Sequence, residues 1–276
     1  LLVVAKQLQE RQEHTAAITI YQQLLDAPQS PEVKVVLLHD LASSQAVLKE
    51  HQAALTHFAL AIAHASQLPE PDLVLWSSSL SSSGTIYFRM GVTDSAYHLA
   101  QQAIDLVQPW PFRIKPVNHQ PQVDSLVLDA YYQLMVLQQQ EGDFEQSGKT
   151  IDTAIGYLSS KRGPDDAGLS DLYTNAAINA WNFGDDAEAT RFGEEALRVC
   201  LLYDSLQLEL STCYNNLGLF CTSRFELHKG MFYYKQAIKT YEAADSTAAT
   251  QLAIVYNNIA SIYGNLGDYH SRYEYM

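Results

Sequence analysis

The chain has 276 residues, of which 47% are hydrophobic and 11% are aromatic, and this composition is too apolar for a disordered chain. Lys and Arg number 17 against 31 Asp and Glu, which gives a formal net charge of −14. Because phosphates and anionic lipids are bound by clustered Lys and Arg, this balance argues against a nucleic-acid-binding or membrane-surface-binding protein.

Helix-breaking residues are few, with 13 glycines and 9 prolines, and this predicts long uninterrupted helices. Apolar and small residues recur along the chain in stripes of helical spacing, each of which begins with Leu or Tyr. The seven stripe starts fall at positions 1, 38, 80, 131, 173, 214 and 256, with spacings of 37, 42, 51, 42, 41 and 42 residues. Such regularity indicates an internal repeat.

A turn signal and a second stripe follow most of the first stripes. Gly-Asp pairs stand at 142–143, 184–185 and 267–268, and Gly91 and Lys49 occupy the matching place in two further segments. Small residues follow at helical spacing, such as Ala96 and Ala100 after Gly91. We therefore expect helical hairpins in which glycine ends the first helix in a left-handed turn and small residues lie where the two helices cross closely. One hairpin cannot bury its apolar faces alone, so neighbouring hairpins must stack.

The residues at 214–237 and 253–269 come nearest to a pattern of an aromatic, Leu-Gly, a second aromatic, Gly-Asp and small residues, although the first stretch lacks Gly-Asp and the second has Ile-Ala in place of Leu-Gly. This pattern resembles the tetratricopeptide repeat (TPR) family over nearly the whole chain. The resemblance implies an all-α, right-handed solenoid of about seven helical hairpins, the last of them incomplete. The spacing near 42 exceeds the usual length of about 34 residues. In this it is similar to the long-helix repeats of kinesin light chains and of bacterial peptide-sensing or regulator-linked arrays.

We expect a single array that begins and ends inside helices, as a piece of a longer protein does. Its repeats span approximately 1–34, 35–76, 77–127, 128–169, 170–210, 211–252 and 253–276. The longest spacing contains an insertion at 107–123, and its four prolines predict an extended, non-helical segment. Trp110 and Phe112 within it either dock a partner or cover the seam between repeats, and covering is favoured because large aromatics seldom stay exposed.

No enzyme or metal motif emerges from the sequence. HExxH, GxSxG, Walker and GxGxxG patterns are absent. His57 and His64 share a helix face, but a separation of about 10 Å is too wide for one metal without a third ligand. Cys213 and Cys221 lie about 12 Å apart along a helix, beyond disulfide reach. We therefore expect no catalytic residue, cofactor or metal.

The resemblance places ligand binding on a concave groove formed by the first helices. Asn175, Asn216 and Asn258 recur at one repeat position, with Asn215 and Asn257 beside two of them. An amide both donates and accepts, so such a ladder can hydrogen-bond an extended peptide backbone; the alternative is that these amides cap or bridge helices. Aromatic and charged anchors beside the ladder are Trp181, Tyr132, Phe88 and Arg89.

The predicted function is that of a non-catalytic scaffold that binds a protein or peptide ligand in its concave groove. One alternative is a sensor or regulatory array of a larger bacterial signalling or transcriptional regulator, and another is an architectural module that self-associates through uncapped ends. No nucleic-acid binding and no membrane insertion are expected of this segment. The compartment stays open: cytoplasmic, or periplasmic if the full-length chain carries a signal peptide.

Overall fold

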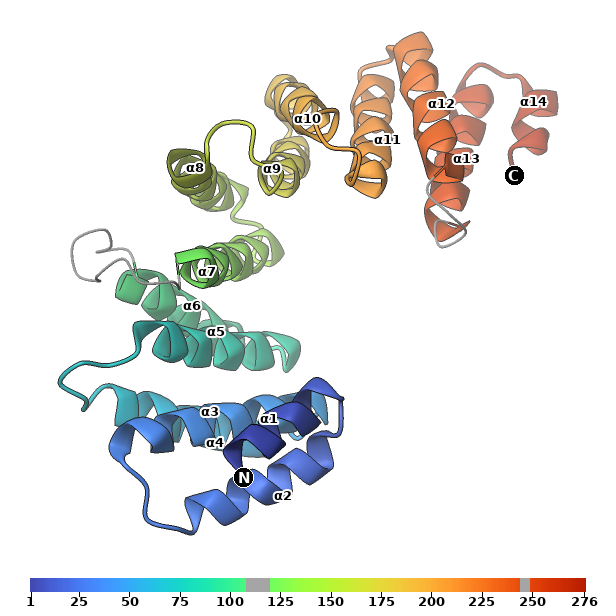
Figure 1. Cartoon of the computed structure of the whole chain (residues 1–276). Helices are drawn as coiled ribbons and strands as arrows, with labels where there is room; N and C mark the ends of the chain where they lie inside the picture. Colours follow the sequence, from blue (N-terminus) through green and yellow to red (C-terminus); the bar gives the residue numbers. More distant parts are fainter. Residues whose placement is uncertain (108–119, 244–248) are drawn as a thin grey trace. The chain divides into compact units, whose positions relative to one another are not determined.

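The computed structural model describes residues 1–107, 120–243 and 249–276, and within these ranges every regular element is a helix (Figure 1). Fourteen α-helices follow one another in this part of the chain. The prediction of an all-α fold is therefore confirmed. The chain forms two compact units, residues 1–141 (unit 1) and 142–276 (unit 2).

Unit 1 contains α1 (Leu2–Glu10), α2 (His14–Leu25), α3 (Pro31–Val47), α4 (His51–Ala65), α5 (Leu73–Arg89), α6 (Thr93–Val107) and α7 (Gln120–Gln140). Each helix packs against the next one in the chain, and α5 also packs against α3 and α7. Contacts between alternate helices are those expected when hairpins stack side by side.

Unit 2 contains α8 (Phe144–Arg162), α9 (Leu169–Phe183), α10 (Asp186–Cys200), α11 (Gln207–Ser223), α12 (Leu227–Ala243), α13 (Ala249–Asn265) and α14 (Tyr269–Glu274). Consecutive helices again pack together, and α11 also contacts α9 and α13. The final helix, α14, has only six residues.

Each odd-numbered helix is followed by one residue with a positive φ angle, eleven positions after the predicted stripe start. Four of these residues are glycines: Gly91 (74°), Gly142 (78°), Gly184 (92°) and Gly267 (74°). The other three are Gln12 (65°), Lys49 (63°) and Phe225 (61°). The predicted left-handed turn is thus confirmed, and it forms even where the sequence lacks glycine.

The aspartate of each Gly-Asp pair has a separate role at the start of the next helix. Asp143, Asp185 and Asp268 each accept a hydrogen bond from the backbone N–H three residues on, at 3.0, 3.0 and 3.1 Å. Because the first N–H groups of a helix lack intrahelical partners, these carboxylates cap the even-numbered helices. Glycine ends one helix and aspartate begins the next.

Small residues of the second stripe lie buried between the paired helices, as predicted. Ala17, Ala54, Ala100 and Ala189 have no exposed surface. Tyr21, Phe58 and Tyr234 fill the space at the next stripe position and are equally buried. In the first stripe, Leu1 and Val4 are 73% and 45% exposed. The first stripe is thus exposed at the start of α1, whereas in later repeats its residues are buried or, like Tyr173 and Tyr214, half-buried.

The predicted insertion at 107–123 is described only at its edges. Residues 108–119, with Trp110 and Phe112, lie outside the described residues. Val107 still belongs to α6, and α7 already begins at Gln120. The expectation of a non-helical segment up to residue 123 is therefore wrong at its end. Pro121 is the second residue of α7, and proline is tolerated in the first turn because no intrahelical partner awaits its N–H.

Candidate functional site: a groove between α5 and α7

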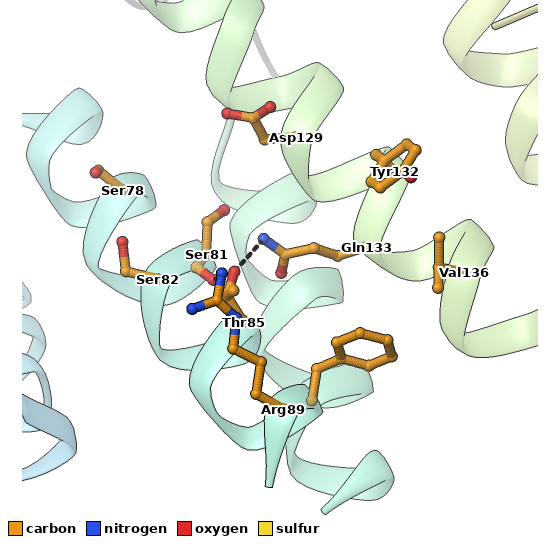
Figure 2. A pocket seen from close by; sticks show the side chains of 10 residues that line it. Ser78, Ser81, Ser82, Thr85, Arg89, Asp129, Tyr132, Gln133 and Val136 are labelled. Carbon is orange, nitrogen blue, oxygen red and sulfur yellow. Dashed lines mark hydrogen bonds between the residues drawn. The ribbon is translucent and has the colours of Figure 1, made fainter. Parts of the chain in front are cut away.

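A groove of about 450 Å³ lies between α5 and α7 in unit 1. Figure 2 shows the side chains that surround it. Helix α5 contributes Ser78, Ser81, Ser82, Thr85, Phe88 and Arg89, and α7 contributes Asp129, Tyr132, Gln133 and Val136. Three of the predicted site residues, Phe88, Arg89 and Tyr132, are thus brought together.

The repeat explains why these side chains share one groove. Counted from the stripe starts Leu80 and Tyr131, the four lining residues of α7 and four of the six of α5 occupy the same positions: two before, one after, two after and five after. Phe88 and Arg89 stand further along α5. The stripe residues themselves are buried against neighbouring helices. Residues just beside the stripe consequently line the surface between two successive odd-numbered helices.

Two hydrogen bonds organise the polar side of the groove. Thr85 Oγ1 donates to the carbonyl oxygen of Ser81 at 3.0 Å. With its only hydrogen committed there, Thr85 Oγ1 accepts from Gln133 Nε2 at 2.8 Å, the bond that is dashed in Figure 2. This side-chain contact links α7 to α5 across the groove.

The floor of the groove retains unused hydrogen-bonding capacity. Ser81 Oγ and Gln133 Oε1 are buried and have no hydrogen-bond partner within the described protein. Buried polar atoms are nearly always paired with protein or water, so each of these unpaired atoms marks a place where a further polar group or a water molecule fits.

The other side of the groove is apolar, and its ends carry opposite charges. Tyr132 is 53% exposed and lies beside Phe88 and Val136. Arg89 and Asp129 lie at opposite ends of the view in Figure 2. Burial raises the pKa of Asp129 above its ordinary value. The groove thus offers hydroxyls, an aromatic face, a cation and a carboxylate, a combination suited to a mixed polar and apolar ligand.

The predicted asparagine ladder is placed in unit 2, on α9, α11 and α13. Asn258 Nδ2 donates to Asn215 Oδ1 at 3.1 Å, which joins α13 to α11. Asn215 Nδ2 in turn faces Asn216 Oδ1 at 3.5 Å. Asn175 Nδ2 donates to the carbonyl oxygen of Asp171 in its own helix at 2.8 Å. The Asn258–Asn215 contact has the geometry expected if these amides bridge neighbouring helices.

Asn257 is exposed and lines a second hollow, of about 380 Å³, on α13 and α14. Ser261, Asn265 and Arg272 lie beside it. Asn257 and Ser261 stand one and five residues after Tyr256, the same repeat positions that line the α5/α7 groove. Two repeat positions thus face a hollow in both units.

Trp181, predicted as a groove anchor, is half-buried in unit 2. It packs against the buried cluster of Ala177, Ala189 and Leu217, and its ring lies 6.3 Å from that of Phe220. Trp181 belongs to unit 2 and Tyr132 to unit 1. In the structure, Trp181 contributes to the packing of α9 against α11.

Three of the ten lining residues were predicted from the sequence, and Ser78 and Asp129 are among those that were missed. Both stand two residues before a stripe start, in the turn of helix that precedes the counted positions. Counting the repeat backwards by half a turn would have found them.

Over the described ranges, no group of three or more His, Cys, Asp or Glu side chains is arranged to hold a metal ion. No helix in those ranges is both long and apolar enough to cross a membrane.

Comparison with known proteins identifies the fold. Residues 253–276 match the family model of the tetratricopeptide repeat. No curated protein matches the chain in sequence. Among solved structures, BtubC (BKLC) from P. vanneervenii is 18% identical with a TM-score of 0.69, covering 85% of this chain and 91% of that one.

Two further structures extend the comparison. The apo form of the quorum sensor NprR from B. thuringiensis is 12% identical with a TM-score of 0.62, covering 99% of this chain and 84% of that one. A putative kinesin light chain with TPR-like repeats from Podosopora anserina is 12% identical with a TM-score of 0.59, covering 82% of this chain and 99% of that one. The predicted resemblance to long-helix TPR arrays is confirmed, and the chain has a TPR-type helical-repeat fold.

Proposed function

We propose that the chain is a non-catalytic binding module that holds an extended peptide or protein segment in the α5/α7 groove. The observation that carries this proposal is the half-exposed ring of Tyr132 next to the serine and threonine hydroxyls of α5. Aromatic rings that are partly exposed beside polar groups are common anchors for protein ligands.

An extended peptide matches what the groove offers. Its backbone presents an N–H and a C=O every residue, at about 3.3 Å per residue, and the hydroxyls of Ser78 and Ser82 can pair with either group. A bound side chain can pack on Tyr132, Phe88 and Val136. We expect the segment to place an acidic group near Arg89 and a basic or neutral one near Asp129, because these charges lie apart in the groove.

A regulatory array within a larger protein is a second candidate. It is favoured by the structural likeness to the NprR quorum sensor, at 12% identity over 99% of this chain. In that case the peptide bound by the groove would be a signal rather than an assembly partner. A flanking DNA-binding or other effector domain in the full-length sequence would support this reading.

Selection of peptides on the intact chain tests the proposal. Random peptides displayed on phage are selected on immobilised wild-type protein, and the enriched ones are synthesised and titrated by fluorescence anisotropy. We expect Tyr132→Ala and Arg89→Ala each to weaken binding about tenfold, equal to about 1.4 kcal/mol.

Matched controls lie on the same unit. Leu60 of α4 is 45% exposed, and Arg11 is exposed after α1, and neither lines the groove. Leu60→Ala and Arg11→Ala should leave the affinity unchanged. Equal losses in the groove and control variants, or no loss in any of them, would refute the assignment of the groove.

A further inference from the structure

Two of the three cysteines have their sulfur atoms in contact. Cys200 Sγ and Cys213 Sγ are 3.7 Å apart, and both residues are buried with free thiols. Cys200 is the last residue of α10, and Cys213 lies within α11. The turn at 201–206 reverses the chain, so residues 13 positions apart face each other.

The surroundings of this thiol pair are specific to it. Ala196 and Leu210 pack around it, and Thr174 Oγ1 lies 3.7 Å from Cys213 Sγ. Cys221 is also buried but follows Cys213 by eight residues on the same helix, about 12 Å away. Cys221 therefore provides an internal control for the reactivity of a lone buried thiol.

The contact makes the two sulfurs chemically unequal. The hydrogen bond from Cys200, with a smaller one from Thr174, lowers the pKa of the Cys213 thiol. The same contact with Cys213, together with burial, raises the pKa of Cys200. As a thiolate, Cys213 would accept hydrogen bonds from both Cys200 and Thr174, and the thiolate is the form that attacks oxidants and disulfides.

We propose that Cys200 and Cys213 form a reversible intramolecular disulfide when the chain meets a hydroperoxide. The Cys213 thiolate attacks one peroxide oxygen, the O–O bond breaks, and a sulfenic acid and hydroxide result. The Cys200 sulfur then displaces the sulfenic hydroxyl, which leaves as water with the Cys200 proton. Both thiols are oxidised by one electron each, and hydrogen peroxide is reduced to two waters.

The required movement is small. A disulfide needs its sulfurs at about 2.05 Å, so the two atoms approach by about 1.7 Å. Cys200 stands at a helix terminus, where the backbone frays more readily than within a helix. This fraying gives both the sulfur movement and the access for a small oxidant. The resulting bond would fix the end of α10 to α11.

The test is the mass of the native full chain before and after hydrogen peroxide. We expect a loss of two hydrogens, about 2 Da, that dithiothreitol reverses. All three cysteines fall in one tryptic peptide, residues 199–224, so cleavage after Glu209 and after Tyr214 is needed to place each cysteine in its own fragment. The linked fragments should join Cys200 to Cys213.

Three serine variants complete the test. Cys221→Ser should still lose 2 Da, whereas Cys200→Ser and Cys213→Ser should not. In the oxidised wild type, closing this loop should raise the thermal midpoint of unit 2 by about 5 °C or more. Native protein that keeps its mass while reversibly unfolded protein forms the bond would overturn the proposal. A bond to Cys221, or only intermolecular bonds, would overturn it as well.

Discussion

Asn258 donates a hydrogen bond from Nδ2 to Oδ1 of Asn215, 3.1 Å away, and thereby joins α13 to α11. Both residues stand on odd-numbered helices, beside the stripe that is buried in the core. A side-chain amide that bridges two helices contributes to stability. It has less capacity left for a ligand backbone than an unpaired amide has.

The first prediction concerns this bridge. Asn258→Ala should lower the free energy of unfolding by about 1 kcal/mol, because the part-buried bond to Asn215 is lost. The exposed neighbour Asn257 provides the control, and Asn257→Ala should have little effect on stability. Urea unfolding followed by circular dichroism measures both. A double-mutant cycle with Asn215→Ala that shows no coupling would contradict a bridge.

The second prediction concerns the turn after α11. Phe225 has φ 61° and is 83% exposed, in a place where four other repeats carry glycine. Phe225→Gly should raise the free energy of unfolding by about 1 kcal/mol, because a side chain in the left-handed region is strained. Phe225→Ala keeps the strain and removes only the ring, so it should not be stabilised to the same degree. Equal stability of the glycine and alanine variants would show that the strain is not relieved.

Helix packing gives a third prediction. A Cβ at Gly218 would lie 2.6 Å from the ring of Tyr234, a fully buried side chain. Gly218→Ala should therefore destabilise unit 2 by about 1–3 kcal/mol through overpacking. A Cβ added at Gly156 of α8 would meet no other atom within 4 Å. Gly156→Ala should therefore be neutral, or stabilising because alanine favours the helix. Thermal unfolding that ranks the two variants the other way would contradict the close approach of α11 and α12.

The fourth prediction concerns pH. Ser79 Oγ donates to the carbonyl oxygen of Leu75, so it accepts from His39 Nδ1–H at 2.8 Å. Burial, assisted by the charge of Lys6 and opposed by Asp72, lowers the pKa of His39 to about 4. Between the ordinary value near 6.5 and about 4, only the unfolded chain takes up this proton. Stability should therefore fall as the pH is lowered through this window.

The comparison that isolates this effect is His39→Gln, which cannot titrate. Between pH 7 and pH 5 the wild type should lose about 1–2 kcal/mol more than the variant. The groups around His39 include Lys6, Asp40 and Asp72, and they remain in both proteins. Urea unfolding at the two pH values gives the difference. Identical losses of stability in the two proteins would mean that protonation of His39 does not contribute to the pH dependence.

The repeated features of the fold could be read from the sequence because each is a local rule applied several times. Small residues at helical spacing predicted the close helix crossings, and Gly-Asp pairs predicted the turns. Even Lys49, without glycine, was placed correctly by the repeat, and its φ of 63° confirms the turn. Proline content, in contrast, predicted too long a non-helical insertion, because Pro121 fits the first turn of α7.

The site was harder to predict because it depends on which way individual side chains turn. Tyr132, Phe88 and Arg89 were predicted as groove anchors, and the structure brings them to one groove. Trp181 was predicted together with them, but its ring packs toward Phe220. The contact between Cys200 and Cys213 was missed because helical spacing measures distances along one helix only. It arises from the chain reversal between α10 and α11.

Photo-crosslinking of a selected peptide tests the central claim, that the α5/α7 groove holds the ligand, most directly. A benzophenone amino acid replaces Ser82 on the groove wall in one protein and exposed Leu60 of α4 in another. Irradiation with the bound peptide should give an adduct at position 82 and none at position 60. A peptide that binds with unchanged affinity but attaches at position 60, or attaches at neither, would contradict the account.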